Sequence, residues 1–383
     1  MPPRVLVIGG ALRDIVALAG SEPDPGSSTP GRVRVGAGGV ARNVAENLAR
    51  LGVSVELVAA FGADADGEHL RAGCAAVGVG LRHAIASPFP TGRYVAILAP
   101  GGELVHAVND MRATEAIAPS DLAPALAGLR SGDVLVVDAN LSEPALASCA
   151  LAADAAGVIV IADPVSVAKA RRLRAMTPTP WLVTPNRDEL AALVAPADDA
   201  DRVAAAAGLT DDTDRAAAAL LATGGRHIWC RLGPAGSRLY TAGEPVPAGV
   251  VSGGSSPSRI DVAAPATRVV DVTGAGDAAT ACFVQAILAG AAPEQAVVVG
   301  QRAAALTVAD QHAVRPDLAA ALAPAAGLAP ADGLAHPAAP APAPGFAVRH
   351  TAGPDPAEAD RAAHDRATHD RATHDTATGR QAP

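Results

Sequence analysis

Seven residues, Asp271 to Asp277, have the composition of a site that binds a negatively charged group. Gly274, Ala275 and Gly276 are small enough to let the backbone approach a ligand closely, and a helical segment follows them. The unpaired N–H groups at the start of a helix attract negative charge. We therefore predict an anion hole at Gly274–Gly276.

Asp277 places a carboxylate directly after this predicted anion hole. We expect the helix N-terminus to favour the ionised form, so that Asp277 is ready to accept a proton at neutral pH. Residues 268–270 are predicted to form a strand that ends at Asp271, which sets the loop at the carboxyl end of a strand. Two orientations of Asp277 stay open: it faces a reacting hydroxyl group, or it caps its own helix.

The loop is not a P-loop, because no lysine follows its glycines as G-x-x-x-x-G-K-[ST] requires. A second glycine-rich segment fits a dinucleotide-binding pattern in Gly36, Gly38 and Ala41, and Glu56 follows about 20 residues later. That pattern is typical of an NAD-type oxidoreductase. Two observations weaken this alternative: Glu56 falls inside its strand, and the strand before the glycines alternates between polar and apolar residues, unlike a central parallel strand.

Two further positions carry candidate chemistry. Asn186 and Glu189 are spaced to lie on one face of a helical turn, although a charged first turn of a surface helix has the same pattern. Lys169 is the only lysine of the chain. A lysine that survives a strong arginine bias indicates a place where arginine cannot substitute, and chance survival is the alternative.

Alternating strands and helices position these residues. We predict helices at 39–52, 64–77, 275–289 and 294–308, and strands at 4–9, 53–62, 133–140, 157–164, 180–186, 226–233 and 236–242. Two alternating strands flank Pro100–Gly102 and predict a hairpin that leaves the main sheet and covers a site. The sequence thus predicts an α/β domain over 1–322, with lid strands at about 12–35 and 91–110.

Composition narrows the function. Net charge is −9 and no basic stripe occurs, which argues against binding to a nucleic acid polymer. The four cysteines form no C-x-x-C pair, as expected for reduced thiols in a cytoplasmic protein. No apolar stretch has the length of a membrane span. Residues 323–383 are rich in Ala and Pro and then repeat every five residues, so we predict a disordered tail whose recurring histidines (His364, His369, His374) are solvated.

Residues 1–320 resemble the PfkB family of carbohydrate and nucleoside kinases. The resemblance rests on "GGVARNVAENLARLG" (38–52), "TPNRDEL" (184–190), "RLGPAG" (231–236) and "DVTGAGDAATACFVQAILAG" (271–290). It implies a ribokinase-like α/β/α fold of three layers, with a mostly parallel central sheet and a small β-sheet lid. Within the family, "GGELVHAVNDM" (101–111), "VVDANLSEPAL" (136–146) and "ADPVSVAKARRLR" (162–174) are similar to the pseudouridine kinases.

The resemblance implies a role for each candidate residue. Asp277 is implied as the base on the accepting hydroxyl group, beside the anion hole of Gly274, Ala275 and Gly276. The implied acceptor-binding residues are Asp14, Gly39 and Asn43, to which we add Asn140, although Asn140 also suits a turn, and Lys169. On the nucleotide side we expect Asn186, Arg231, Gly233, Gly236 and Thr273. Glu189 is implied as an indirect organiser of Mg²⁺, and Asp271 with Thr273 as ligands of a monovalent cation such as K⁺.

The resemblance therefore implies an ATP-dependent phosphotransferase that acts on an alcohol group, with the 5′-hydroxyl of pseudouridine as acceptor. Two alternatives remain: another kinase of the family that resembles ribokinase or fructokinase, and a non-catalytic binding protein on the same fold. Asp277 and Glu189 argue against the second alternative. We also expect a homodimer through the lid. Arg231 departs from the pattern, since many relatives carry Ser or Thr there.

Overall fold

The computed structural model describes residues 3–24, 26–194, 211–242 and 257–323. Its main sheet has eight strands, which are β1 Val5–Ile8, β4 Val55–Val58, β9 Val134–Asp138, β10 Ile159–Asp163, β11 Leu182–Val183, β12 His227–Arg231, β13 Ser237–Thr241 and β14 Ser258–Val262. Their order is β14-β13-β12-β11-β10-β9-β1-β4. All neighbours from β4 to β12 are parallel, and β13 and β14 join antiparallel at one edge.

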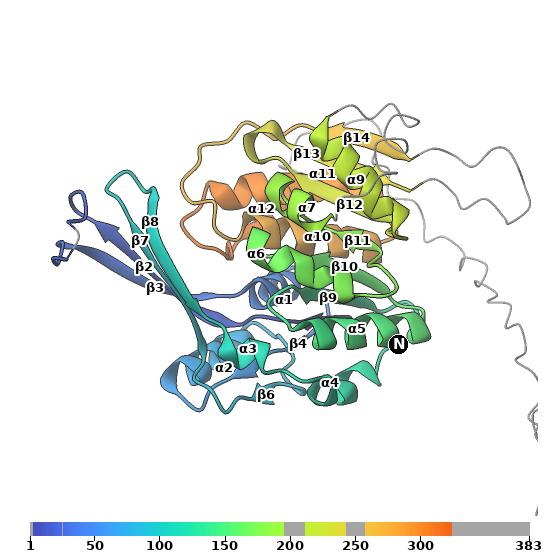
Figure 1. The fold of residues 1–383 in the computed structure, drawn as a ribbon, viewed down its shortest axis with the longest axis horizontal. Helices are drawn as coiled ribbons and strands as arrows, with labels where there is room; N and C mark the ends of the chain where they lie inside the picture. The colour runs from blue at the N-terminus through green and yellow to red at the C-terminus, as the bar shows by residue number, and fades with distance from the viewer. Residues whose placement is uncertain (1–2, 25, 195–210, 243–256, 324–383) are drawn as a thin grey trace, which may run out of the picture. The chain divides into compact units, whose positions relative to one another are not determined.

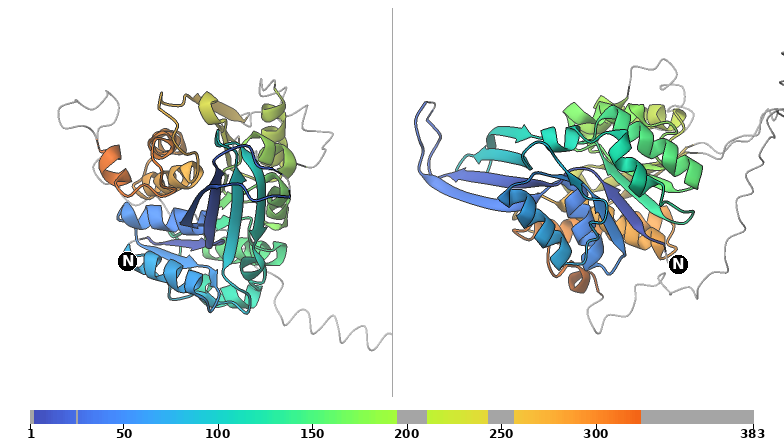
Figure 2. Two further views of the ribbon diagram at one scale, coloured as in Figure 1. Left: turned by 90° about the vertical axis from the view of Figure 1, so that its left-hand side faces the viewer. Right: turned by 90° about the horizontal axis from the view of Figure 1, so that it is seen from below.

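Helices cover both faces of this sheet (Figure 1, Figure 2). One face packs against α1 Val40–Arg50, α2 Ala65–Ala76, α10 Ala275–Leu288 and α11 Pro293–Val308, and the other against α4 Pro119–Leu126, α5 Glu143–Ala156, α7 Arg187–Leu193 and α9 Asp212–Ala222. Alternate side chains of a strand point to opposite faces. Leu6 and Ile8 of β1 accordingly enter one core, and Val5 and Val7 the other. The predicted three-layer α/β/α fold is confirmed.

A smaller four-stranded sheet extends from the main body (Figure 1). Its strands are β2 Leu12–Ala19, β3 Gly31–Gly38, β7 Gly92–Leu98 and β8 Leu104–Asp110, in the order β3-β2-β7-β8. The remaining elements are the strand pair β5 Ala60–Phe61 and β6 Ile85–Ala86, the short helices α3 Arg112–Glu115, α6 Val167–Ala170 and α12 Leu318–Leu322, and the 3₁₀ turns η1 Arg171–Ala175 and η2 Gly233–Ala235.

Two predictions from the sequence are wrong in detail. Residues 53–62 form two strands in different sheets, because the chain leaves the main sheet after Val58. Residues 268–270 form no strand: the backbone N–H groups of Val270 and Asp271 instead donate to the carbonyl oxygen of Val308, at the end of α11. The segment before α10 is thus held by a helix end and not by a sheet.

The dinucleotide-binding alternative is also wrong. Gly36 and Gly38 lie inside β3 of the small sheet, so they do not link a central parallel strand to its helix. Glu56 lies within β4, where its carboxylate accepts a hydrogen bond from the backbone N–H of His83.

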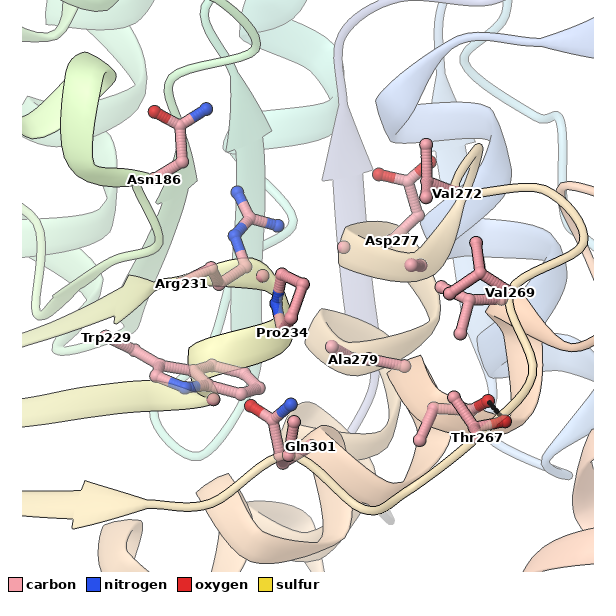
Figure 3. A pocket seen from close by; sticks show the side chains of 18 of the residues that line it. Asn186, Trp229, Arg231, Pro234, Thr267, Val269, Val272, Asp277, Ala279 and Gln301 are labelled. Carbon is pink, nitrogen blue, oxygen red and sulfur yellow. Dashed lines mark hydrogen bonds between the residues drawn. The ribbon is translucent and has the colours of Figure 1, made fainter. Parts of the chain in front are cut away.

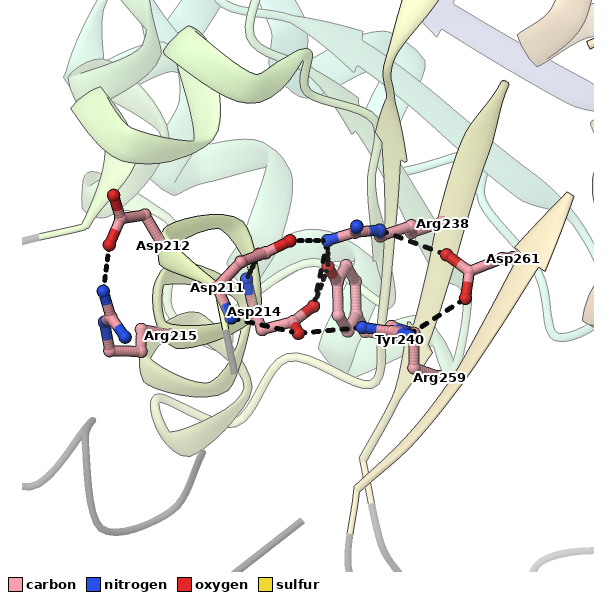
Figure 4. Close-up of polar contacts among 8 residues, drawn as sticks. All are labelled: Asp211, Asp212, Asp214, Arg215, Arg238, Tyr240, Arg259 and Asp261. Atoms are coloured by element: carbon pink, nitrogen blue, oxygen red, sulfur yellow. Dashed lines mark hydrogen bonds and ion pairs between the residues drawn. The ribbon is translucent and has the colours of Figure 1, made fainter. Parts of the chain in front are cut away.

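An ion-pair cluster, shown in Figure 4, ties α9 to β13 and β14. The carboxylate of Asp214 is completely buried and pairs with Arg238 at 3.2 Å and with Arg259 at 2.8 Å. The hydroxyl group of Tyr240 donates to the same carboxylate at 2.7 Å. This cluster lies outside the cavity described below and fixes the edge of the main sheet.

Several sequence predictions fall outside the described residues, among them the tail from residue 324 onward and its three histidines. Cys74, Cys149, Cys230 and Cys282 are buried free thiols. Within the described ranges, no helix has both the length and the apolar character that a membrane crossing requires.

Candidate active site

Two aspartates that the sequence reading did not select end adjacent strands of the main sheet. Asp138 ends β9 and Asp163 ends β10, and the two are register partners. Asp138 accepts hydrogen bonds of 2.9 Å from the backbone N–H groups of Gly10, Ala41 and Asn140. Burial raises the pKa of Asp138. The signal for both residues was available, because each is the first acidic residue after a buried apolar run.

The predicted anion hole forms the first turn of α10. Gly274 is the N-cap residue, with a φ of 77° that favours glycine. The N–H groups of Gly276 and Asp277 have no hydrogen-bond partner among the described residues, as expected for the start of a helix. The turn can therefore offer these donors to an anion.

Asp277 lies at this turn and points away from its own helix. Asp277 is only 8% exposed, and its Oδ2 accepts a hydrogen bond of 2.7 Å from Nδ2 of Asn43 on α1. Burial, followed by the charge of Asp163, raises its pKa to about 7, although the bond from Asn43 and the charge of Arg231 oppose the rise. The helix start was expected to favour the ionised form of Asp277, and burial works against that preference.

Asn186 and Glu189 form a reciprocal cap at the start of α7. Oδ1 of Asn186 accepts from the backbone N–H of Glu189 at 2.9 Å, and Oε2 of Glu189 accepts from the backbone N–H of Asn186 at 2.8 Å. Glu189 is buried, and burial raises its pKa. The charged first turn foreseen as an alternative is thus present, with Glu189 facing inward.

Arg231 ends β12 and reaches the start of α10. Its Nη2 donates to Oδ2 of Asp163 at 2.9 Å and to the carbonyl oxygen of Thr184. A side chain at position 276 would overlap Nη1 of Arg231, so this close approach requires glycine. Gly233 and Gly236 flank the turn that follows Arg231.

A cavity of about 680 Å³ brings four of the five nucleotide-side candidates together (Figure 3), and Thr273 is not among its lining residues. Its lining includes Asn186, Glu189, Arg231, Gly233, Gly236, Ala275, Gly276 and Asp277. Trp229, Val269, Val272 and Val308 supply an apolar wall, and Gln301 adds an amide. The volume suits a ligand of nucleotide size. Gln301 was missed because no local pattern marks it.

Apart from Asn43, the acceptor-side candidates lie near Asp138 or on the small sheet. The backbone N–H of Asn140 donates to Asp138, and Asp14 belongs to β2. Nζ of Lys169 donates to Oδ1 of Asn140 at 2.6 Å, so the lone lysine meets another predicted residue. Gly39, the N-cap residue of α1, packs against the carbonyl group of Gly10. Burial raises the pKa of Asp14 on β2 to about 6, against the charges of Arg42 and two further arginines.

Asp271 is held by the small sheet. Its Oδ2 accepts from Nη2 of Arg34 on β3 at 2.8 Å, and its Oδ1 accepts from the backbone N–H of Thr273 at 2.9 Å. Nη1 of Arg34 donates to the carbonyl oxygen of Gln311 at 3.0 Å. A guanidinium group therefore already neutralises the carboxylate predicted to bind a monovalent cation.

Across the described residues, no cluster of three or more His, Cys, Asp or Glu side chains could hold a metal ion.

Comparison with known proteins identifies the family of the chain. Residues 2–319 match the pfkB family of carbohydrate kinases. The chain belongs to the pfkB family. It is 30% identical over 320 residues to a pseudouridine kinase of Escherichia coli strain K12, an alignment that covers 83% of this chain and 94% of that protein. It is also 33% identical over 192 residues to a pseudouridine kinase of Arabidopsis thaliana, which covers 49% of this chain and 50% of that one.

Solved structures agree on the fold. A structure of Arabidopsis thaliana ribokinase complexed with ribose and ATP superimposes with a TM-score of 0.65 at 24% identity, over 84% of this chain and 99% of that one. The protein is thus a phosphotransferase that acts on a hydroxyl group, as its family membership shows. The alternative of a non-catalytic binding protein, against which Asp277 and Glu189 argued, is not supported.

Proposed function

We propose that this pfkB kinase uses ATP to phosphorylate the 5′-hydroxyl group of pseudouridine, giving pseudouridine 5′-phosphate. The observation that carries the proposal is Asp277, a buried carboxylate that Asn43 orients beside the unpaired N–H groups of α10. The choice of acceptor is supported by the similarity to the pseudouridine kinase of Escherichia coli over 83% of this chain.

Asp277 serves as the general base in this proposal. The acceptor's oxygen forms a bond to the γ-phosphorus while the bond from that phosphorus to the β,γ-bridging oxygen breaks, and ADP leaves. Asp277 takes the proton of the acceptor hydroxyl group as the new bond forms. A pKa of about 7 suits this role, because a base works best when its pKa lies near the operating pH.

The cavity holds the nucleotide. The apolar lining residues on the side of Trp229 suit the flat face of a base, and the polar lining residues suit phosphate groups. The nucleotide-binding residues of the proposal are Asn186, Arg231, Gly233, Gly236 and Thr273. Gly274–Gly276 form the anion hole, in which the N–H group of Gly276 is unpaired among the described residues and that of Ala275 donates to the carbonyl oxygen of Val272 at 3.4 Å. Charge on the transferred phosphoryl group is stabilised there without reorganisation of the site.

The acceptor lies on the other side of Asp277. Asp14 accepts hydrogen bonds from ribose hydroxyl groups, while Gly39 allows close approach and Asn43 contributes an amide. Lys169 and Asn140 act as one unit, since Nζ of Lys169 already donates to Oδ1 of Asn140. Burial lowers the pKa of Lys169. A partly desolvated ammonium group is a strong donor to a carbonyl oxygen such as those of the uracil ring.

Carboxylates of the cavity fit Mg²⁺, which prefers oxygen ligands and keeps several waters. Glu189 and Asp163 both line the cavity, so we propose that Glu189 organises the ion through water. An Mg²⁺ ion bound there would neutralise charge on the phosphate groups.

We call the small four-stranded sheet the lid, because we expect it to cover the site and to exclude water from the transferable phosphate. Two of its strands carry Asp14 and Arg34. We also expect the lid to form a homodimer and the protein to act in the cytoplasm on small molecules. The four free thiols are compatible with that compartment.

An ATP-consumption assay tests the proposal, with pseudouridine, uridine, ribose and fructose as acceptors and mass spectrometry of each product. We expect pseudouridine to give the highest kcat/KM and a product phosphorylated at the 5′ position. The variant Asp277→Asn is the control for contaminating kinases. Preferred phosphorylation of ribose or fructose would replace pseudouridine as the acceptor.

A further inference from the structure

Arg231 is anchored along one edge of its guanidinium group. Nη2 donates to the carboxylate of Asp163 at 2.9 Å and to the carbonyl oxygen of Thr184. The backbone N–H of Arg231 also donates to the carbonyl oxygen of Pro185 at 2.8 Å. Because β12 and β10 belong to the same sheet, these contacts fix the position of the cation.

The other edge of the guanidinium group faces the start of α10. Nη1 lies against the Cα atom of Gly276, so that any side chain at position 276 would overlap it. In the described part of the chain, no hydrogen-bond partner occurs for Nη1, and Arg231 lines the cavity. A fixed cation therefore presents a free donor edge beside the unpaired N–H groups of Gly276 and Asp277.

The surrounding carboxylates keep this guanidinium group charged in spite of its burial. Asp163, Glu189 and Asp277 all lie close enough to Arg231 to raise its pKa, although burial works in the opposite direction. Among the described residues that line the cavity, Arg231 is the only arginine or lysine. The cavity thus has an acidic lining with one positive group, located where the anion hole begins.

We propose that Arg231 is a catalytic residue, whose free Nη1 edge donates to the oxygens of the γ-phosphoryl group during its transfer. The inference rests on the proposed phosphoryl transfer and deepens it. While the acceptor oxygen bonds to the γ-phosphorus and the bond to the β,γ-bridging oxygen breaks, Arg231 and the N–H groups of α10 share the charge on the γ-phosphoryl oxygens. The proton passes to Asp277, and Asp163 is the positioning residue for Arg231.

Arginine suits this position better than lysine. The planar guanidinium group donates along two edges at once, so one edge is anchored by Asp163 and Thr184 while the other contacts the phosphoryl group. A single ammonium group cannot span both sets of partners. Arg231 in this way supplies the side-chain cation that a P-loop takes from its lysine, although the loop itself contains none.

The test compares wild type with Arg231→Met and Arg231→Lys. We expect Arg231→Met to lower kcat by about 10²- to 10³-fold with a smaller change in KM for ATP, the scale of one lost oxyanion donor. Arg231→Lys should retain an intermediate kcat. In Arg231→Ala, added guanidinium chloride at millimolar concentration should restore part of kcat. The matched control is Arg187→Met, an exposed arginine at the start of α7.

A second measurement does not depend on turnover. Wild type should bind ADP with Mg²⁺ more tightly when aluminium fluoride is added, because that complex imitates the transferred phosphoryl group, and Arg231→Met should lose this gain while still binding ADP. Equal gains in both proteins, or no gain in wild type, would overturn the inference. A kcat unchanged in Arg231→Met at an unchanged melting temperature would overturn it too. Absence of wild-type activity on every acceptor would refute only the proposed function.

Discussion

Nδ2 of Asn43 donates a hydrogen bond of 2.7 Å to Oδ2 of Asp277, a residue 234 positions later in the chain. Asn43 belongs to α1 and Asp277 to α10, and the two helices pack against each other on one face of the main sheet. The amide therefore determines where the carboxylate points. It also stabilises the ionised form, which burial disfavours.

Replacing Asp277 by Asn should remove the base and leave the shape of the site intact. We expect kcat to fall by at least about 10²-fold, with little change in the affinity for ATP, because only proton transfer is lost. Steady-state kinetics and titration calorimetry of nucleotide binding measure the two effects. The control is Asp154→Asn, an exposed acid on α5 that should behave as wild type. Near-normal turnover in Asp277→Asn would sink the assignment.

The pKa of about 7 for Asp277 predicts the pH dependence of the free enzyme. Protonation below pH 7 blocks the base, so kcat/KM should fall as the pH decreases through that value. The groups that act on Asp277 are Asn43, Arg231, Asp163 and Asp138, from four different elements.

Asn43→Ala removes the hydrogen bond that favours the ionised carboxylate. The acidic limb of kcat/KM should then move to higher pH by about one unit, as expected for the loss of a bond to a charged group. A limb at the same pH in both proteins would contradict the stated role of Asn43.

The ion pair between Arg34 and Asp271 predicts the response to K⁺. Since a guanidinium group already neutralises Asp271, K⁺ should change the kcat of wild type by less than about twofold. Arg34→Gln frees the carboxylate, and we expect activation by K⁺ of about fivefold, equivalent to about 1 kcal/mol. The control is Arg32→Gln, an exposed arginine on the same strand. Strong K⁺ activation of wild type would show that the cation displaces Arg34.

The lid has an apolar outer face that predicts a homodimer. Alternate residues of β3 point to opposite sides, so Arg34 contacts the body while Val33 and Val35 face away, 67% and 51% exposed. Val95 and Val108, which are register partners on β7 and β8, are also exposed. Sedimentation velocity should find a dimer of the wild type and a monomer of Val35→Glu, while Arg32→Glu remains dimeric. A monomeric wild type would rule out the expected homodimer.

The cluster around Asp214 predicts a stability effect without a direct effect on catalysis. Asp214→Asn should lower the free energy of unfolding by about 3 kcal/mol, because two arginines lose a buried counter-charge. Asp212→Asn on the same helix should change it by less than about 0.5 kcal/mol, since that carboxylate is almost fully exposed. Thermal and denaturant unfolding measure both. Equal effects would show that burial does not decide the outcome.

The sequence by itself determined the fold class and the helix start after Gly274, because both depend on local patterns. Apolar strand runs, small residues and helix starts recur at short range, so the three layers and the start of α10 at Gly274 were predictable. The spacing of Asn186 and Glu189 also predicted the start of a helix, which is α7. The local pattern gave a wrong prediction at residues 268–270, which resemble a strand in sequence. In the structure the end of this segment is hydrogen-bonded to the last residue of α11.

Only the tertiary structure decided the chemistry of the side chains, because it depends on burial and on contacts between distant residues. The sequence left two orientations for Asp277, toward a reacting group or back onto its own helix. In the structure its carboxylate bonds to Asn43 of α1 and lines the cavity, and no side chain among the described residues caps the start of α10. Burial, which no local pattern reports, raised the pKa of Asp277 to about 7. Arg231 looked like a departure from a family pattern, and the sheet alone brings it beside Gly276.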